Sequence, residues 1–251
     1  ARIWLEKHEG VPKANQLSDA IRGLEGLALQ ARPVELHLRL ARVGREVWLD
    51  MAQPSGKVVR IDASGWSVED EAPVVFQHSK LTGAMVTPEA GQLEAFRPLL
   101  NLTDRGWDLI RGWMVSSFYP DIPHPVLILT GPQGTAKSGC ARLLSLLIDP
   151  STAPLRSVPK SERDWATVLA GATVMAIDNM SSIPAWLSDA ICRAVTGDGH
   201  VARELYTDSG IFARSFKRTL ILTGIDLGRI NGDLLERSIM VELPPISGEQ
   251  R

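Results

Sequence analysis

The segment 129–144, LTGPQGTAKSGCARLL, holds a glycine-rich loop of the kind that binds phosphate groups. It follows the apolar run VLIL and fits the spacing G-x-x-x-x-G-K-[ST], except that Ala136 stands in the second glycine position. Glycines let backbone N–H groups turn toward a phosphate, and a helix N-terminus adds partial positive charge. The methyl group of Ala136 is tolerable if that residue has a negative φ. The residues expected to contact phosphates are Gly131, Pro132, Gln133, Gly134, Thr135, Ala136, Lys137, Ser138 and Gly139.

Two side chains of this loop and one strand end could serve a nucleoside triphosphate and Mg²⁺. Lys137 offers a point charge for the β- and γ-phosphates, and the Ser138 hydroxyl is a Mg²⁺ ligand. The later run ATVMAIDNMSS is apolar up to Asp178, whose carboxylate would bind Mg²⁺ directly or through water. Asn179 stands where many ATPases carry a glutamate that polarises water; an amide can orient water but cannot act as a base. A glycine-rich turn with a surface lysine, and a strand ending at a surface aspartate, are the simpler interpretations.

The elements that must position these residues alternate between strand and helix. Apolar runs predict buried strands over 126–130, 172–177, 220–223 and 239–243, with a short candidate over 155–158. Helices are expected to follow Thr103, the glycine-rich loop, and Ser161, which with Asp164 resembles a capping box. Continuous apolar strands alternating with helices predict an α/β fold whose parallel sheet is covered by helices on both faces. The glycine-rich loop adds the expectation of a P-loop NTPase, and the family resemblance given below implies the ASCE or AAA+ type.

The first hundred residues follow a different pattern. Ser18 is a plausible cap for a helix with apolar residues at positions 21, 24 and 27. Between Val34 and Trp66, apolar and polar residues alternate between turn signals, which predicts a small antiparallel β unit. We therefore expect an accessory N-terminal domain over 1–100 and the P-loop core over 101–251. The chain begins at Ala1 without methionine, so we expect either a fragment or a processed form of a longer protein.

Composition excludes several other classes. The net charge of −2 argues against a protein that coats nucleic acid with its whole surface, although it leaves room for a local basic surface. Cys140 and Cys192 form no CxxC pair, so neither a zinc site nor a disulfide framework is expected, and a reducing cytoplasm is the expected location. No apolar run approaches the roughly 18 residues that span a bilayer, so no membrane partner is expected. His78, His124 and His200 are isolated and are expected to be structural or surface residues.

The segment beyond Asp178 carries a series of short matches to a known family. The matching residues are Thr196-Gly197-Asp198, Ala202-Arg203, Leu205-Tyr206, Phe216-Lys217 and Glu236-Arg237. This segment resembles superfamily 3 helicases of the phage and plasmid primase-helicase branch, in which a "tGgD…aR.lY…F…fK" segment precedes the sensor strand and an "rR" box follows it. The chain is also similar to bacterial mobile-element ATP-binding proteins, often joined to primase modules or encoded near them. The resemblance covers residues 34–246 and is most specific over 126–243.

The resemblance implies an AAA+-type core that assembles into a homo-oligomeric ring. Its sensor strand would place Thr223 at the γ-phosphate, where the family usually has asparagine, and Asp226 is a second polar candidate nearby. Arg237 matches the arginine finger, which would reach a neighbour's ATP and neutralise developing charge. A surface arginine at a helix end is the alternative for Arg237.

The resemblance also implies a contact with single-stranded DNA. The stretch 201–216 suits a hairpin, and in the family this region faces the central pore. Arg203, Tyr206, Lys217 and Arg218 would then meet the phosphate backbone and stacked bases. A solvated hairpin with ordinary surface charges is the alternative.

The leading hypothesis is a DNA-acting ATPase of the helicase type that uses ATP and Mg²⁺ in replication of a phage, plasmid or integrated element. A primase or another replication protein is a further expected partner. The catalytic roles would fall to Lys137, Asp178, Asn179, Thr223 and Arg237. Three residues depart from the usual pattern, at positions 136, 179 and 223, so a nucleotide-binding switch or assembly module with little hydrolysis is the alternative. A P-loop kinase of small molecules is a third hypothesis, against which the Arg237 box and the lack of a recognisable lid argue.

Overall fold

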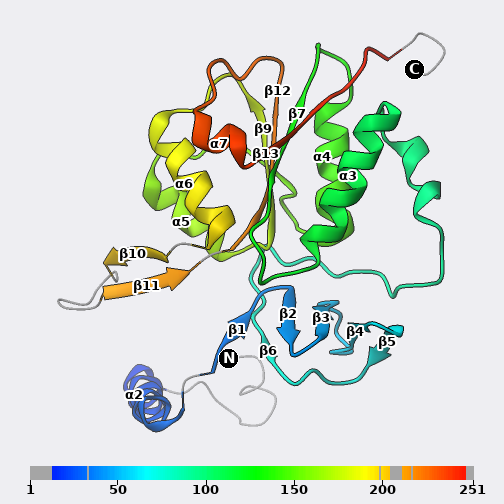
Figure 1. Cartoon of the computed structure of the whole chain (residues 1–251). Helices are drawn as coiled ribbons and strands as arrows, with labels where there is room; N and C mark the ends of the chain where they lie inside the picture. The colour runs from blue at the N-terminus through cyan, green and yellow to red at the C-terminus, as the bar shows by residue number, and fades with distance from the viewer. Residues whose placement is uncertain (1–12, 33, 198, 204–210, 216, 247–251) are drawn as a thin grey trace. The chain divides into compact units, whose positions relative to one another are not determined.

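The computed structural model describes residues 13–32, 34–197, 199–203, 211–215 and 217–246 (Figure 1). The chain divides into two compact units, residues 1–35 and residues 36–251. In the first unit, helix α2 spans Ala14–Gln30. The expectation that Ser18 caps this helix is wrong, because the helix begins four residues earlier. There the Gln16 side chain accepts a hydrogen bond from the backbone N–H of Lys13, at 3.1 Å, and satisfies the helix entrance.

The second unit begins with the expected antiparallel sheet. Its strand order is β2-β3-β4-β5, and a separate parallel pair joins β1 to β6. The strand bounds are β1 Leu36–His37, β2 Leu40–Val43, β3 Glu46–Asp50, β4 Val58–Asp62, β5 Gly65–Glu69 and β6 Val75–Phe76. Gly44, with a φ of +61°, makes the tight turn between β2 and β3. The prediction of a small antiparallel β unit in this region is confirmed.

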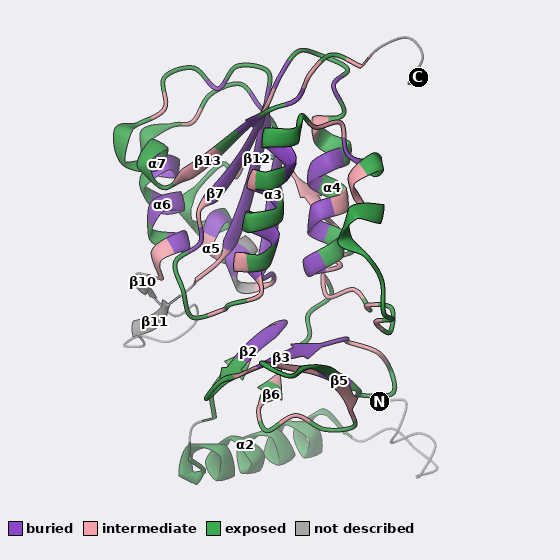
Figure 2. Cartoon of the chain, turned by 45° about the vertical axis from the view of Figure 1, so that its right-hand side comes forward, coloured by how far each residue is buried: buried purple, intermediate pink, exposed green. Residues whose placement is uncertain are grey.

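The core of the second unit is a five-stranded, all-parallel sheet of order β13-β7-β12-β9-β8. Its strands are β7 Val126–Thr130, β8 Leu155–Arg156, β9 Val174–Met180, β12 Thr219–Gly224 and β13 Ser238–Glu242. The three central strands, β7, β12 and β9, are almost entirely buried, as Figure 2 shows. Such continuous apolar strands need cover on both faces, and the predicted parallel sheet is confirmed.

Helices cover both faces of this sheet (Figure 1). Side chains of α3 and α4 pack on one face, and those of α5, α6 and α7 pack on the other. The helix bounds are α3 Asp104–Ser117, α4 Lys137–Ile148, α5 Glu162–Ala170, α6 Ala185–Thr196 and α7 Gly232–Glu236, with short 3-10 turns η1 Leu93–Ala95 and η2 Arg97–Leu99. The Thr103 side chain accepts from Gly106 N at 3.1 Å, and Ser161 accepts from Asp164 N at 3.2 Å, so both predicted caps are confirmed.

A buried ion pair joins the antiparallel sheet to the parallel core. The Arg39 guanidinium donates to Asp149 Oδ1 at 2.9 Å and to the backbone carbonyls of Asp50, Gly83 and Pro150. The other carboxylate oxygen of Asp149, Oδ2, accepts from the backbone N–H groups of Thr173, which precedes β9, and of Val174, its first residue. Since Asp149 follows α4 directly, one carboxylate connects the N-terminal sheet, α4 and the start of β9.

The predicted hairpin is present as β10 Gly199–Arg203 paired antiparallel with β11 Ile211–Ser215. Its expected turn and Tyr206 lie outside the described residues. The predicted domain boundary near residue 100 stays a prediction.

Candidate functional site

The glycine-rich loop connects β7 to α4 at the carboxyl edge of the parallel sheet. Gly131 and Gly134 have φ values of +138° and +81°, and Ala136 has a φ of +63°. A Cβ at position 131 would lie 2.6 Å from the backbone oxygen of Leu243, so only glycine fits there. The condition of a negative φ at Ala136 is not met: the alanine adopts the left-handed conformation in which glycine is usual. The loop geometry overrides the preference of alanine, at a cost of roughly 1–2 kcal/mol.

Helix α4 begins at this loop with an open N-terminus. Ala136 is its N-cap residue, and no side chain caps this end. The first N–H groups of a helix lack intrahelical partners, and together with the helix dipole they favour an anion. The chain therefore presents uncapped amides where the sequence predicts phosphate.

Lys137 bends back over the same loop. Its Nζ donates to the backbone oxygens of Gly131 and Pro132, at 2.8 and 2.7 Å, and to Thr135 Oγ1 at 3.3 Å. Partial burial lowers the pKa of Lys137, and the nearby carboxylate of Asp178 acts in the opposite direction. The ammonium group is thus held by loop carbonyls, which a phosphate could replace as its partner.

Asp178 lies beside the loop at a β-bulge. Leu222 of β12 pairs with Ile177 and Gly224 pairs with Met180, so Asp178 and Asn179 together oppose the single residue Thr223. Asn179 accommodates the bulge with a φ of +58°, a conformation that asparagine tolerates better than most residues. A bulge of this kind re-aims a side chain at the end of a strand.

Three polar groups converge on this bulge. The hydroxyls of Ser138 and Thr223 both donate to Asp178 Oδ1, at 2.8 and 2.6 Å, and the Asn179 N–H donates to Thr223 Oγ1 at 2.9 Å. The predicted residues from the loop, the acidic strand end and the sensor strand therefore lie together. Sequence spacing could not reveal that Thr223 bonds to Asp178 itself.

A cavity of about 280 Å³ opens over these groups. Its walls are residues 133–139 of the loop and residues 179 and 223–225 of the two strand ends. A hydroxyl and a carboxylate oxygen are ligands that suit Mg²⁺, which usually keeps several waters and takes few protein ligands. Within the described residues no cluster of three or more His, Cys, Asp or Glu could hold a metal alone. The donor set therefore fits a magnesium ion that is completed by phosphate and water.

Asn101 is a contact of the loop that the sequence analysis missed. Its side-chain amide donates to the Thr135 carbonyl at 3.2 Å and to the Pro244 carbonyl at 2.6 Å, which ties the loop to the segment after β13. An open cavity of about 600 Å³ adjoins it, lined by residues 97–102, Ala136 and Ile246. The sequence offered only a weak signal, one asparagine within the apolar run LLNL.

Arg237 lies at the amino ends of the parallel strands, whereas the glycine-rich loop lies at their carboxyl ends. Its backbone oxygen accepts from Val126 N, at the start of β7, whereas the loop follows the end of that strand. The five residues of β7 place these edges roughly 13 Å apart at about 3.3 Å per residue. The guanidinium bonds to Asp233, with Nη2–Oδ1 at 3.0 Å, and its side chain is 42% exposed. Arg237 is therefore remote from the loop of its own chain.

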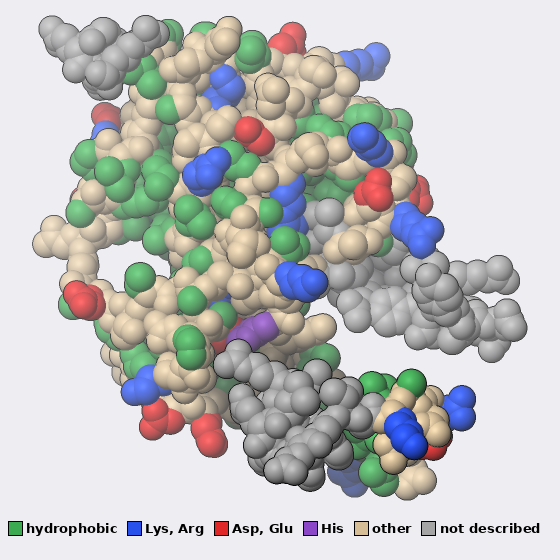
Figure 3. Space-filling model, turned by 180° about the vertical axis from the view of Figure 1, so that it is seen from behind, with side chains coloured by type: hydrophobic (Ala, Val, Ile, Leu, Met, Phe, Trp, Pro, Cys, Tyr) green, Lys and Arg blue, Asp and Glu red, His purple; other side chains and the backbone are tan. Residues whose placement is uncertain are grey.

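Among the residues predicted to bind DNA, the structure describes the side chains of Lys217 and Arg218. Lys217 Nζ donates to the Asp121 carbonyl at 2.6 Å, and Arg218 Nε donates to the Leu169 carbonyl at 2.9 Å. Both side chains thus hold the base of the hairpin to the core. On the face seen in Figure 3, the described Lys and Arg side chains are scattered among acidic and apolar ones. The DNA contact, including Arg203 in β10, stays a prediction.

Of the histidines expected to be structural or surface residues, His78 and His124 can be assessed, whereas the His200 side chain lies outside the described residues. His78 Nε2 lies 2.6 Å from Asp50 Oδ2. Burial, with a smaller contribution from the positive charge of Lys217, lowers the pKa of His124 to about 4. His124 is therefore neutral at physiological pH and is unsuited to proton transfer there.

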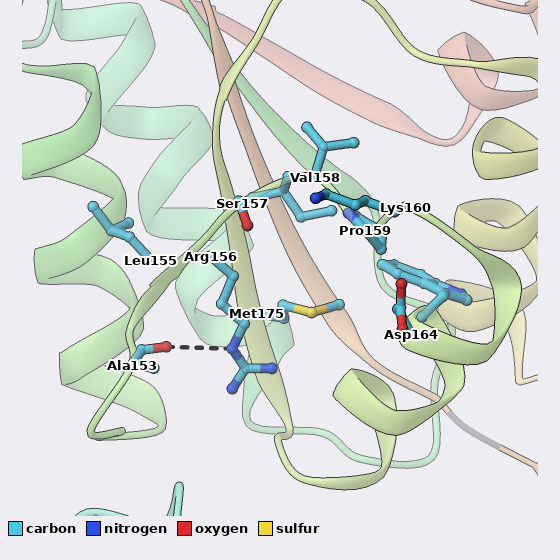
Figure 4. A pocket seen from close by; sticks show the side chains of 11 residues that line it. Ala153, Leu155, Arg156, Ser157, Val158, Pro159, Lys160, Asp164 and Met175 are labelled. Carbon is cyan, nitrogen blue, oxygen red and sulfur yellow. Dashed lines mark hydrogen bonds between the residues drawn. The ribbon is translucent and has the colours of Figure 1, made fainter.

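Another cavity, of about 500 Å³, lies between β8 and α5 (Figure 4). Trp165, Met175 and Ile177 contribute apolar surface, and Arg156, Lys160 and Asp164 contribute charged groups of both signs. The Arg156 guanidinium donates to the Ala153 carbonyl at 3.3 Å. None of the residues predicted from the sequence to do chemistry lines this cavity.

These features define an α/β protein in which a glycine-rich loop, a carboxylate and two hydroxyls meet at the carboxyl edge of a parallel sheet. The family model described as "Actinomycete integrative conjugative element replication protein" matches residues 98–247. This match spans more than half of the chain, and the chain belongs to that family of replication proteins. A search of curated proteins found no match. Among the described residues, no helix has both the length and the apolar character needed to cross a membrane.

Solved structures show only distant likeness. The C-terminal region of NrS-1 (residues 305–718) is 12% identical with a TM-score of 0.46, over 90% of this chain and 62% of that one. A JCV helicase is 11% identical with a TM-score of 0.41, over 57% and 42% of the two chains. NtrX from Brucella abortus, solved in complex with ATP, is 17% identical with a TM-score of 0.32, over 66% and 40%. The chain thus spans about half the length of these proteins.

Proposed function

We propose that the chain is the ATPase part of a replication motor of an integrated mobile element, of the AAA+ helicase type. The observation that carries the proposal is the meeting of Ser138, Asp178 and Thr223 beside the uncapped N-terminus of α4. Membership of a replication-protein family supports the biological setting. Single-stranded DNA as substrate and a homo-oligomeric ring as the working form belong to the same proposal.

Each residue at the site has a role that its position supports. The amides of 131–139 bind the phosphate oxygens, and Lys137 exchanges its loop carbonyls for the β- and γ-phosphates. Ser138 and Asp178 hold Mg²⁺, which when bound neutralises charge on the phosphates. Asn179 lines the cavity, and its amide orients the attacking water. The cavity lined by residues 97–102 receives the base, because it adjoins the same loop at Ala136.

The alternative function is a nucleotide-dependent switch with slow hydrolysis. Its support is the 280 Å³ cavity, whose lining residues include no Asp or Glu that could act as a base. A motor and a switch share the binding chemistry but differ in turnover. Steady-state ATP hydrolysis with and without single-stranded DNA separates them: a motor is stimulated by the strand, whereas a switch binds ATP and turns over negligibly in both conditions.

Binding itself is tested by Lys137→Ala. The variant should lose at least about tenfold in affinity for a fluorescent ATP analogue, because a charge-assisted phosphate contact contributes about 1.5–3 kcal/mol. Lys160→Ala is the matched control, since Lys160 is an exposed lysine at the other cavity. Circular dichroism checks that both variants fold. An unchanged affinity in the folded Lys137→Ala protein would contradict the proposal.

A further inference from the structure

We infer that Thr223 is a positioning residue that fixes Asp178 and the bulge of β9, and that it does not contact the γ-phosphate. The inference rests on the proposed function, because it concerns how the same site holds Mg²⁺. It departs from the sensor role that the sequence resemblance implies for this position. The evidence is the pair of hydrogen bonds that Thr223 makes inside its own chain.

The Thr223 hydroxyl cannot both hold Asp178 and donate a hydrogen bond to a phosphate. A threonine hydroxyl has a single proton to donate. In the structure that proton goes to Asp178 Oδ1, at an oxygen–oxygen distance of 2.6 Å, and the oxygen accepts from the Asn179 N–H at 2.9 Å. Phosphate oxygens are acceptors and need a donor. Thr223, which is 1% exposed, has no proton left for them.

The same two bonds explain how the acidic strand end is arranged. Ser138 and Thr223 both donate to Oδ1 of Asp178, so that oxygen is saturated from two sides. Among the described residues no hydrogen bond involves Oδ2, so this oxygen is available to bind Mg²⁺ or one of its waters. The bond from the Asn179 N–H to Thr223 holds this left-handed residue, which lines the cavity. Thr223 thus sets the orientation of both Asp178 and Asn179.

The chain offers a matched control on the same strand. Thr219 is also buried in β12, but its hydroxyl has no hydrogen-bond partner within the described structure. Thr219→Val therefore makes the same chemical change as Thr223→Val without removing a bond. Thr223→Ser keeps the hydroxyl and should behave like the wild type.

The test measures how strongly the site depends on Mg²⁺. Binding of a non-hydrolysable, fluorescent ATP analogue is titrated with Mg²⁺, and is measured separately in EDTA. Thr223→Val should need about tenfold more Mg²⁺ for half-maximal binding, since Asp178 loses a charge-assisted bond, while its affinity in EDTA changes less than about twofold. Turnover, where the wild type has it, should fall in parallel. Thr223→Ser and Thr219→Val should match the wild type in both measurements.

Opposite outcomes would overturn the inference. An unchanged Mg²⁺ requirement in Thr223→Val, with weaker analogue binding in EDTA, would show that Thr223 contacts the phosphate. If Thr223→Val does not fold, Thr223→Asn decides: we expect a higher Mg²⁺ requirement, whereas faster turnover at an unchanged requirement would support a phosphate sensor. A wild-type protein that binds no analogue with Mg²⁺ would contradict the proposed function itself, so the two failures can be told apart.

Discussion

Ala136 holds a left-handed backbone conformation inside a loop whose two other turns are made by glycines. Alanine has a Cβ that makes this conformation unfavourable by roughly 1–2 kcal/mol, whereas glycine adopts it freely. The strain lies directly before Lys137, at the residue that caps α4. A residue held in an unfavourable conformation persists only where its surroundings determine it. The bond from Asn101 to the neighbouring Thr135 carbonyl is one such constraint.

Ala136→Gly should therefore stabilise the protein. Relief of the strain is partly offset by the greater freedom of glycine in the unfolded chain, which leaves a gain of about 0.5–1 kcal/mol in the free energy of unfolding. Urea denaturation followed by circular dichroism measures it. Ala166→Gly, within α5, is the control and should lose about 1 kcal/mol. A loss of stability in Ala136→Gly would mean that the loop conformation does not strain the alanine.

The two non-glycine residues with positive φ at the site, Ala136 and Asn179, show what could be predicted from single residues and what could not. The types and spacing of Gly131, Lys137, Ser138 and Asp178 predicted correctly which residues meet, because a strand–loop–helix unit brings them to one edge of the sheet. The conformations of Ala136 and Asn179 could not be predicted, since local preference favours negative φ for both residues. Contacts made only in the folded chain, such as the Asn179–Thr223 bond, decide them.

Among the elements, the strands and helices of the core were predictable because their apolar runs are buried on both faces. The bulge in β9 was not predictable, since a one-residue slip between β9 and β12 leaves no mark on either sequence. The link between the two sheets was equally hidden. It depends on Arg39 and Asp149, which are 110 positions apart.

Removing the Arg39 side chain should destabilise the link between these elements. Arg39→Met leaves the Asp149 carboxylate, 8% exposed, without its hydrogen-bonded cation and frees three carbonyls, which should lower the free energy of unfolding by about 3–5 kcal/mol. Arg42→Met is the control, because the Arg42–Asp121 pair is solvent-exposed and should contribute about 0–1 kcal/mol. Urea denaturation of both variants gives the comparison. Equal losses would show that the buried pair contributes no more than the exposed one.

Adding Asp149→Asn to Arg39→Met should restore part of the lost stability. The double variant no longer buries an unpaired charge, whereas the asparagine oxygen can still accept from the N–H groups that lead into β9. Recovery would locate the penalty in the stranded carboxylate. If the double variant is no more stable than Arg39→Met, the lost carbonyl contacts are responsible instead.

At the scale of the whole molecule, the sheet separates two sets of residues. The glycine-rich loop, Asp178 and Thr223 lie at the carboxyl ends of the strands, whereas Arg237 and the base of the hairpin lie at the amino ends. Arg237 therefore cannot reach a nucleotide on its own chain without a large rearrangement. If it serves hydrolysis as proposed, it must serve the site of another copy, so this role requires an oligomer. Asp233 holds the guanidinium by an ion pair across one helical turn.

Mixing experiments test this arrangement directly. Wild-type protein mixed with Arg237→Ala should lose ATPase activity more steeply than in proportion to the variant fraction, because each variant subunit disables a neighbour's site while its own loop stays intact. Arg45→Ala, which removes an exposed arginine in the turn between β2 and β3, is the control and should leave activity unchanged at every ratio. Nucleotide binding by Arg237→Ala alone should equal that of the wild type, since a finger acts on the transition state. A strictly proportional loss of activity on mixing would show that each chain hydrolyses ATP independently, and Arg237 would then be a surface arginine paired with Asp233.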